Sequence, residues 1–289
     1  MGFFDGLHLG HAMLLKRANE IGERDNLIPS VITFDAHPRS LLSGKPEPLI
    51  NSTTDRAGLI NRLFNIDDII MLHFDKETGS ISGEDFIKHL VNVFGACHLI
   101  AGHNFRFGSG AVGDRHLLAC ECKRSGLGCD IIQEVTLDGV TVSSTLIREL
   151  IADGEMEKAN KYLGHPHVLT NIVGYGFRLG RKLGTPTINM CFPDGILIPA
   201  FGVYASKVFL DDGSEHIGVT NIGVRPTVDN SGEVTAETHI MNLNKNLYGH
   251  QVRIEFHTLL RPETKFSGVD ELKEQIHRDC KAAVDYFNK

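Results

Sequence analysis

The stretch GFFDGLHLGH, residues 2–11, decides how the first half of this chain is expected to fold. It is a glycine-bearing loop that runs straight into an amphipathic helical pattern. A free helix N-terminus favours phosphate because its N–H groups are unpaired and its dipole end is positive. His8 and His11 could donate hydrogen bonds to phosphoryl oxygens. Gly10 lets a ligand approach the backbone, and Gly6 lies in the same loop. The plain alternative is a helix N-terminus with two incidental imidazoles.

Short apolar runs alternate with helical patterns through the first half of the chain. Runs of this length that are apolar on both faces are typical of buried parallel strands. Their alternation with helices predicts a doubly wound, Rossmann-like α/β sheet. The expected strands are residues 31–34, 69–72, 98–101 and 131–135, and the expected helices are residues 11–23, 54–63 and 83–94.

The pattern changes after Val142. Two helical patterns, at residues 143–150 and 155–163, end at the punctuating tripeptide GHP, so we place a domain boundary between residues 164 and 165. Beyond it, glycine-rich strand patterns predict a small antiparallel β-barrel. These strands are expected at residues 168–173, 202–210, 217–222, 235–241 and 251–260.

A final helix is expected to close the barrel. It should start at Ser267, with Asp270 in the capping-box position. Its apolar residues recur at spacings of three and four, which predicts a stripe packed into the core. The stripe consists of Val269, Leu272, Ile276, Cys280 and Val284.

Composition excludes several classes of protein. The 289 residues, 42% of them hydrophobic, suffice for two domains with separate cores. A net charge of −7 without a long basic run argues against a nucleic-acid partner, and no apolar run is long enough to indicate a membrane span. Six cysteines without a Cys-x-x-Cys pair predict free thiols in a reducing cytoplasm.

A second stretch, VSSTLIREL at residues 142–150, carries hydroxyls and an arginine at an expected helix start. Ser143, Ser144 and Thr145, together with Arg148, would make a phosphate-binding corner. Hydroxyl residues at a helix start are more often plain caps, which is the alternative for this stretch.

A third stretch, AGHNFRFGSG at residues 101–110, follows an expected strand at its carboxyl end. Ligands of open α/β sheets bind at this edge. Asn104 could read a base or a ribose there, and Arg106 could hold a phosphate.

The motifs FDGLHLGH, VITFDAHPR, AGHNFRFG and VSSTLIR occur in this order and closely resemble the N-terminal half of the bifunctional bacterial riboflavin kinase/FMN adenylyltransferases, the FAD synthetases. LGRKLGTPTINM (179–190), TNIGVRPTV (220–228) and AETHIMNLNKNLYG (236–249) resemble the second half of the same family. Two independent motif sets therefore cover nearly the whole chain.

The resemblance implies a nucleotidyltransferase domain at residues 1–164 that takes ATP and FMN, forms FAD and releases pyrophosphate. In this domain His8 and His11 would stabilise the α-phosphate under attack. The residues that would hold ATP and its phosphates are Gly6, Gly10, Asn104, Arg106, Ser143, Ser144, Thr145 and Arg148.

The resemblance also implies a riboflavin kinase domain at residues 165–289 that takes riboflavin, ATP and Mg²⁺. Glu237 would be the base that removes the proton of the ribityl 5′-hydroxyl, although its strand pattern alone is typical of a solvated carboxylate. Thr187 and Asn189 would sit at Mg²⁺, since a hydroxyl and an amide suit an oxygen-seeking cation. The other ATP-binding residues would be Gly180, Arg181, Gly184 and Pro186.

Two alternatives to a bifunctional enzyme stay open. One is a riboflavin kinase whose first domain is impaired, and the other is a non-catalytic flavin-binding regulator. The first arises because the phosphate loop should follow a central strand, yet only residues 1–4 precede it. We expect the sheet to need on the order of 5–6 further residues, from the natural chain or from another element. The oligomeric state also stays open, a homo-oligomer included.

Overall fold

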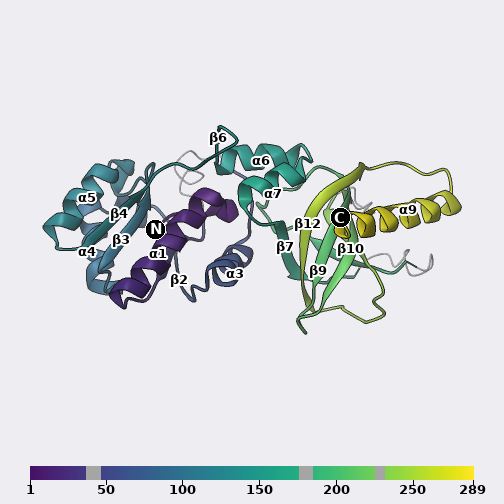
Figure 1. The fold of residues 1–289 in the computed structure, drawn as a ribbon, viewed down its shortest axis with the longest axis horizontal. Helices are drawn as coiled ribbons and strands as arrows, with labels where there is room; N and C mark the ends of the chain where they lie inside the picture. The colour runs from purple at the N-terminus through teal and green to yellow at the C-terminus, as the bar shows by residue number, and fades with distance from the viewer. Residues whose placement is uncertain (37–46, 176–184, 225–231) are drawn as a thin grey trace. The chain divides into compact units, whose positions relative to one another are not determined.

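The computed structural model of the protein describes residues 1–36, 47–175, 185–224 and 232–289 (Figure 1). Contacts between residues divide the chain into two compact units. The first unit comprises residues 1–48 and 56–144, and the second comprises residues 49–55 and 145–289. Each unit has its own strands and its own apolar core.

The first unit is built from alternating helices and strands. In chain order its main elements are η1 (Asp5–Leu7), α1 (Leu9–Asp25), β1 (Ser30–Phe34), α3 (Thr53–Phe64, which begins in the second unit), β2 (Asp68–Leu72), α4 (Gly83–Phe94), β3 (His98–Gly102), α5 (Arg115–Arg124) and β4 (Gly128–Ile132). The shorter elements are η2 (Thr78–Ser80), η3 (Ser109–Ala111), β5 (Thr136–Leu137) and β6 (Val140–Thr141). β1 pairs in parallel with β2, and β3 pairs in parallel with β4, which confirms the predicted α/β class.

Local signals in the sequence set the ends of these helices. Ser82 caps α4 by accepting a hydrogen bond from the Asp85 N–H, and Asp114 caps α5 in the same way. Gly95 ends α4 in the left-handed conformation at φ 65°, which a residue without Cβ adopts at little cost. The two capped helices lie beside β3 and β4 (Figure 1), and buried side chains of all four elements form one core.

Met1 and Gly2 lie between β1 and β3, which are not paired with each other in the described ranges. The Met1 amine donates to the Ile100 carbonyl at 2.9 Å, and the Gly2 N–H donates to the Ile32 carbonyl at 3.2 Å. Residues of a central parallel strand bond alternately to its two neighbours, so these two residues occupy a strand position. Beside them is a cavity of about 460 Å³ lined by β1, β3 and α1. The expectation that further residues complete this sheet stays a prediction.

The second unit is a curled antiparallel half-barrel with helices against it. Its elements are α6 (Ser144–Ala152), which begins with the last residue of the first unit, α7 (Met156–Leu163), β7 (His167–Ile172), β8 (Thr187–Cys191), β9 (Gly202–Phe209), β10 (Glu215–Val224), β11 (Val234–Ile240), β12 (Gln251–Pro262) and α9 (Val269–Phe287). The strand order is β7-β12-β9-β10-β11-β8, and every neighbouring pair is antiparallel. The predicted antiparallel β strands and C-terminal helix are confirmed, and the sheet of the predicted barrel is curled into a half-barrel.

The two faces of this sheet carry different side chains. On one face the buried hydroxyls of Ser206, Thr220 and Thr238 form a chain with O···O distances of 2.8 and 2.9 Å. On the other face Val203 and Val219 belong to the core that includes Ala283 of α9. The second face therefore binds the helix, while the first is stabilised partly by internal hydrogen bonds.

The first turns of α9 differ from the expectation. The helix begins at Val269, and Ser267 donates from both its amide and its hydroxyl to Glu271 at 2.8 and 2.7 Å, rather than pairing with Asp270. Val269 is 58% exposed, and Leu272 and Ile276 line a cavity. The prediction of a core stripe is therefore wrong for the first half of the helix, because periodicity cannot tell a core from a cavity wall.

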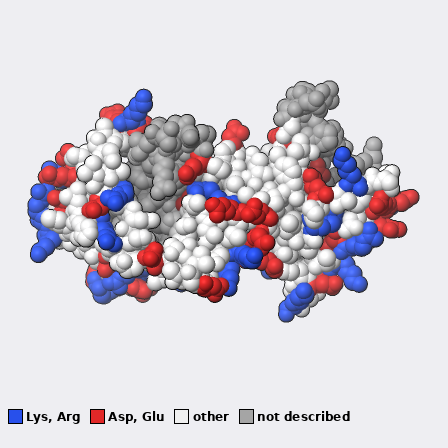
Figure 2. All heavy atoms as spheres, turned by 90° about the horizontal axis from the view of Figure 1, so that it is seen from above, with Lys and Arg blue, Asp and Glu red and all other residues white. Residues whose placement is uncertain are grey.

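Charged side chains of both signs are interspersed on the face drawn in Figure 2. That face shows no broad basic area, in keeping with the net charge of −7. Of the helices in the described ranges, none has the length and apolar character needed to cross a bilayer.

Candidate functional site

The predicted phosphate loop lies at the start of α1. His8 caps the helix, since its Nδ1 accepts a hydrogen bond from the His11 N–H at 3.3 Å. The two imidazoles stack with ring centroids 3.7 Å apart and an interplanar angle of 16°. A side chain at residue 10 would place its Cβ 3.0 Å from the His8 ring, so Gly10 leaves room for the stacked pair. The structure thus brings both predicted catalytic histidines together at one helix N-terminus.

His11 is held uncharged by its surroundings. Burial, followed by the positive charges of His8 and Arg56, lowers the pKa of His11 well below its usual range. The Nδ1 atom of His11 is buried and has no hydrogen-bond partner among the described residues. A neutral imidazole still donates through one ring nitrogen, and an anion beside it would raise its pKa again. The site therefore suits a group whose negative charge grows during a reaction.

The η1 loop has a strained backbone. Phe4 and Leu7 adopt positive φ angles of 58° and 43°, and Gly6 adopts φ 78°. Such conformations cost non-glycine residues on the order of 1 kcal/mol or more each, so the surrounding structure must impose them. The Ser144 hydroxyl donates to the Asp5 carbonyl at 2.9 Å and helps to hold the loop. Gly6 and Ser144 thus shape this loop, while their predicted contacts with ATP stay predictions.

Arg56 of α3 joins the same loop to β1, and no sequence pattern had singled it out. Its side chain is fully buried, and Nη1 donates to the carbonyls of Phe3 at 2.7 Å and Phe34 at 2.9 Å, and to the Thr33 hydroxyl at 3.0 Å. The guanidinium carbon also lies 4.3 Å from the centroid of the Phe3 ring. In the sequence this residue is indistinguishable from a solvated helix arginine, because only the tertiary contacts reveal its role.

The predicted phosphate corner in VSSTLIREL is divided between the two units. Ser143 and Ser144 belong to the first unit, whereas Thr145 and Arg148 belong to the second. All except Ser143 lie on α6. The phosphate contacts expected of these residues stay predictions.

A small aromatic cavity of about 110 Å³ lies at the carboxyl ends of β1, β2 and β3. Its walls include Phe34 and the stacked pair of Phe105 and Phe107, whose ring centroids are 5.6 Å apart. The predicted phosphate ligand Arg106 lines this cavity, while Asn104 is exposed in the turn before it. A planar aromatic ligand would gain stacking contacts here.

A row of side chains crosses the sheet of the second unit. Strand register places Glu237 between Asn221 and Asn189, and the row continues from Asn221 through Val203 to Arg261. Directly opposed residues of neighbouring strands share one face, which here is the face that α9 covers. All of these residues except Asn189 line a cavity of about 240 Å³ between the sheet and the helix. We call it the α9 cavity.

A second cavity in this unit, of about 350 Å³, is lined by β8, β11 and residues 243–248. We call it the β8 cavity. Thr187 lines both this cavity and the α9 cavity. His239 has its Nδ1 2.9 Å from the Pro186 carbonyl oxygen and thereby holds the turn into β8. Groups bound in the two cavities would meet at Thr187.

The residues around Thr187 fit a divalent cation. Thr187 and Asn189 share one face of β8, and Glu237 is the cross-strand neighbour of Asn189. The Asn189 Oδ1 atom is buried without a hydrogen-bond partner among the described residues. Hydroxyl, amide and carboxylate oxygens are ligands that Mg²⁺ accepts. The described residues contain no group of three or more His, Cys, Asp or Glu that could hold a metal, so nucleotide phosphates would have to supply the remaining ligands.

The glycine-rich segment before β8 is described only in part. Pro186 lines the β8 cavity, and its predicted role at the nucleotide stays a prediction. Gly180, Arg181 and Gly184 lie outside the described residues. Their contacts with phosphates stay predictions.

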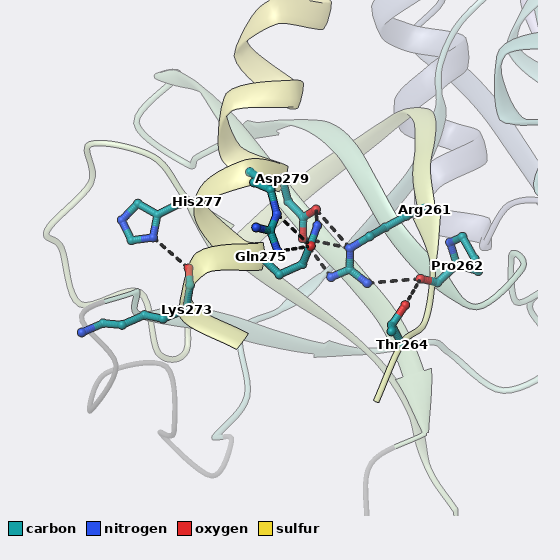
Figure 3. Close-up of polar contacts among 8 residues, drawn as sticks. Arg261, Pro262, Thr264, Lys273, Gln275, His277 and Asp279 are labelled. Carbon is teal, nitrogen blue, oxygen red and sulfur yellow. Dashed lines mark hydrogen bonds and ion pairs between the residues drawn. The ribbon is translucent and has the colours of Figure 1, made fainter. Parts of the chain in front are cut away.

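An ion-pair network forms the β12 side of the α9 cavity (Figure 3). Arg261 donates from Nε and Nη2 to the Asp279 carboxylate of α9 at 2.8 to 3.1 Å. Gln275 donates to the same carboxylate at 2.8 Å. Asp279 is only 4% exposed, so the pair is largely shielded from water. The sequence carried no signal of this network, since its members come from separate elements.

Comparisons with known proteins cover both units. Residues 1–146 match the family model for FAD synthetase, and residues 163–287 match the one for riboflavin kinase. The bifunctional riboflavin kinase/FMN adenylyltransferase of Bacillus subtilis is 32% identical over 292 residues, covering 100% of this chain and 92% of the relative. Its Haemophilus influenzae counterpart is 34% identical over 290 residues, covering 100% and 93%.

A solved structure extends the likeness to three dimensions. The crystal structure named as a macrolide-efflux protein from Streptococcus pneumoniae has a TM-score of 0.84 and 28% sequence identity. The match covers 98% of this chain and 92% of that one. The word efflux in this name describes that protein, and no efflux activity is inferred from it for the present chain.

Proposed function

Since the chain belongs to the family of bifunctional riboflavin kinase/FMN adenylyltransferases, we propose that each unit carries one of its two reactions. The enzyme phosphorylates riboflavin to FMN with ATP, and it adenylylates FMN to FAD with a second ATP, releasing pyrophosphate. Both family models match, so neither a kinase with an impaired first domain nor a flavin-binding regulator finds support in the comparisons.

In the first unit, adenylyl transfer would take place at the loop that carries His8 and His11. The FMN phosphate is already anionic at pH 7 and can attack the ATP α-phosphorus without a general base. The protein then has to align the two phosphates and stabilise the growing charge. The buried Nδ1 of His11, which has no hydrogen-bond partner among the described residues, supports this role, because negative charge that develops beside a neutral imidazole favours its protonation.

The aromatic cavity of the first unit is the proposed place for the flavin ring of FMN. Phe34, Phe105 and Phe107 offer ring faces and edges, and the cavity lies at the strand ends where open α/β sheets bind ligands. Arg106 at its wall would then face the anionic part of a substrate. The proposed contacts of Thr145 and Arg148 with phosphates rest on the motif resemblance.

In the second unit, ATP would bind in the β8 cavity and riboflavin in the α9 cavity. One observation carries this assignment: Thr187 lines both cavities, so the γ-phosphate and the ribityl 5′-hydroxyl can meet beside it. Glu237 lines the riboflavin side and would accept the hydroxyl proton as the base. Thr187 and Asn189 would hold Mg²⁺, which when bound neutralises charge on the phosphates.

The product pattern tests both halves of this proposal. Purified protein incubated with riboflavin, ATP and Mg²⁺ should yield FMN first and FAD later, separated by chromatography. FMN without FAD would reject the adenylyl-transfer site, and unchanged riboflavin would reject the kinase site, in which case added FMN tests the adenylyl-transfer site by itself.

Thr187→Ala tests the proposed cation site. Losing one ligand worth about 1.4 kcal/mol should raise the Mg²⁺ concentration for half-maximal kinase activity roughly tenfold. The measurement is a Mg²⁺ titration of FMN formation, with FAD formation from added FMN as the internal control. An unchanged Mg²⁺ dependence would remove this hydroxyl from the cation site.

Two further proposals concern the boundary between the two domains and the cellular compartment of the protein. The proposed boundary between residues 164 and 165 lies between the end of α7 at Leu163 and the start of β7 at His167, whereas the division by contacts places residues 145–164 with the second unit. Six free cysteines fit a reducing cytoplasm. The oligomeric state is a matter for measurement.

A further inference from the structure

The α9 cavity contains a charged residue that phosphoryl transfer does not use. Arg261 lines the cavity and belongs to the same cross-strand row as Glu237. Between them the row crosses Asn221 and Val203, which makes three steps between neighbouring strands. At about 4.8 Å a step, the two charged residues stand roughly 14 Å apart along the sheet. They therefore mark opposite sides of the cavity floor.

Arg261 is held in one orientation by its partners (Figure 3). Nε and Nη2 donate to the Asp279 carboxylate, whose Oδ1 also accepts from Gln275. Nη1 donates to the Pro262 carbonyl at 3.2 Å. Each terminal nitrogen carries two hydrogens, so both keep a further N–H for which the described residues offer no acceptor. The Arg261 guanidinium is therefore preorganised to donate to a ligand, because its side chain loses little conformational entropy on binding.

The walls near this guanidinium suit a flat ring. The Phe266 ring centroid lies 5.6 Å from the guanidinium carbon. Leu272 and Ile276 of α9 face the cavity although they belong to the stripe expected in the core. The Arg261–Asp279 ion pair holds the helix at a fixed place against β12, so this apolar gap is part of the fold.

We propose that Arg261 is the specificity-determining residue for the flavin in the kinase reaction. Its spare N–H bonds donate to the carbonyl oxygens on the pyrimidine edge of the isoalloxazine ring, while Glu237 meets the 5′-hydroxyl at the other end of the molecule. The spacing of the two residues matches a three-ring system with its ribityl chain. Asp279 and Gln275 are positioning residues that fix the guanidinium. The inference rests on the proposed kinase site at Glu237 and deepens it.

Arg261→Met and a matched control test this role. Loss of charge-assisted hydrogen bonds should raise the KM for riboflavin roughly 10- to 100-fold, with kcat changed less than about threefold, because the contact exists in both the ground and the transition state. Lys281→Met removes a positive charge from the exposed side of α9, away from the Arg261, Asp279 and Gln275 contacts. This control should keep the wild-type KM.

Arg261→Lys keeps the proposal testable if the methionine variant fails to fold. Lysine retains the charge beside Asp279 but lacks the guanidinium fork, so the KM for riboflavin should still rise roughly tenfold while the KM for ATP stays unchanged. An unchanged KM for riboflavin, or equal rises in the two KM values, would overturn the inference. Absence of FMN formation in the wild-type protein would instead overturn the proposed kinase function.

Discussion

The two units hold their sheets together in different ways. The second unit has one continuous antiparallel ladder, in which β9, β10 and β11 follow one another in sequence and in space. The first unit has two separate parallel pairs, with Met1 and Gly2 hydrogen-bonded between them. Parallel strands are joined by crossovers, so their arrangement depends on residues far apart in the chain. The first unit should therefore depend on a few individual contacts much more than the second does.

Glu237→Gln would sharpen the comparison by removing chemistry from the second unit alone. Without its base, FMN formation should fall roughly 10³-fold, whereas FAD formation from added FMN should be unchanged. Both rates can be measured on one preparation. Glu215→Gln on the exposed start of β10 is the control and should leave both rates at the wild-type level. A surviving kinase rate in the Glu237 variant would reject the base assignment.

Arg56→Met should break the first unit selectively. It removes the donor to the Phe34 carbonyl and to the Thr33 hydroxyl, while the Phe3 carbonyl keeps the Thr33 hydroxyl as a donor, and each lost buried donor costs about 1–3 kcal/mol. We expect the free energy of unfolding of the first unit to drop by about 3 kcal/mol. Calorimetry should show one transition at a lower temperature, and Arg62→Met on the exposed part of the same helix should not move it. An equal shift of two transitions would contradict the independence of the units.

His11→Ala would remove chemistry from the first unit alone. Loss of one donor to the developing charge should slow FAD formation roughly 10²-fold, or about 2.7 kcal/mol. FMN formation should stay at the wild-type rate. His116→Ala, an exposed imidazole on α5, is the matched control. If both activities of the His11 variant fell together, misfolding would explain the result better than chemistry.

The pH dependence of stability should also distinguish the units. Burial lowers the pKa of the Met1 amine from 8.0 to about 5, so the folded protein releases this proton earlier than the unfolded chain does. The unfolded chain then binds more protons between pH 5 and 8, and the free energy of unfolding rises with pH in this window. Three pH units correspond to an upper bound of about 4 kcal/mol.

Urea unfolding of the whole protein at pH 5 and pH 8, followed by circular dichroism, measures this effect. An extension of four apolar residues ahead of Met1 turns the amine into an amide, so this variant should lose the pH dependence of its first transition. A dependence that persists in the extended protein would have to come from another group.

The fold followed from patterns that are local in the sequence. The strand expected at residues 31–34 is β1 (Ser30–Phe34), and the one expected at 251–260 is β12 (Gln251–Pro262). Both were visible because burial of one or both strand faces leaves a repeat of apolar residues. The α9 stripe failed in its first half for the converse reason, since apolar residues at Leu272 and Ile276 line a cavity with the same spacing as a core.

The candidate sites differ in the same way, since some of their residues are close in sequence and others come from distant elements. That His8 and His11 lie together could be predicted because one helix start holds both of them, while their catalytic role stays a prediction. Arg56 and the Arg261–Asp279 pair could not, because their roles arise from contacts between distant elements. The position of Thr187 between two cavities depends likewise on how β8 packs in the sheet, which no local pattern records.

The hydroxyls of Ser206, Thr220 and Thr238 form a hydrogen-bonded chain in which all three O–H bonds can point the same way along the chain. Each hydroxyl donates once, so the proton order runs either toward Thr238 or away from it. Thr238 is among the residues that line the β8 cavity. A ligand atom that accepts a hydrogen bond from Thr238 favours the arrangement in which the O–H bonds point toward Thr238. A ligand atom that donates to Thr238 favours the opposite arrangement. The two arrangements differ only by rotation of three O–H bonds. The half-barrel can thus reverse the polarity of the Thr238 hydroxyl beside the β8 cavity without moving a heavy atom.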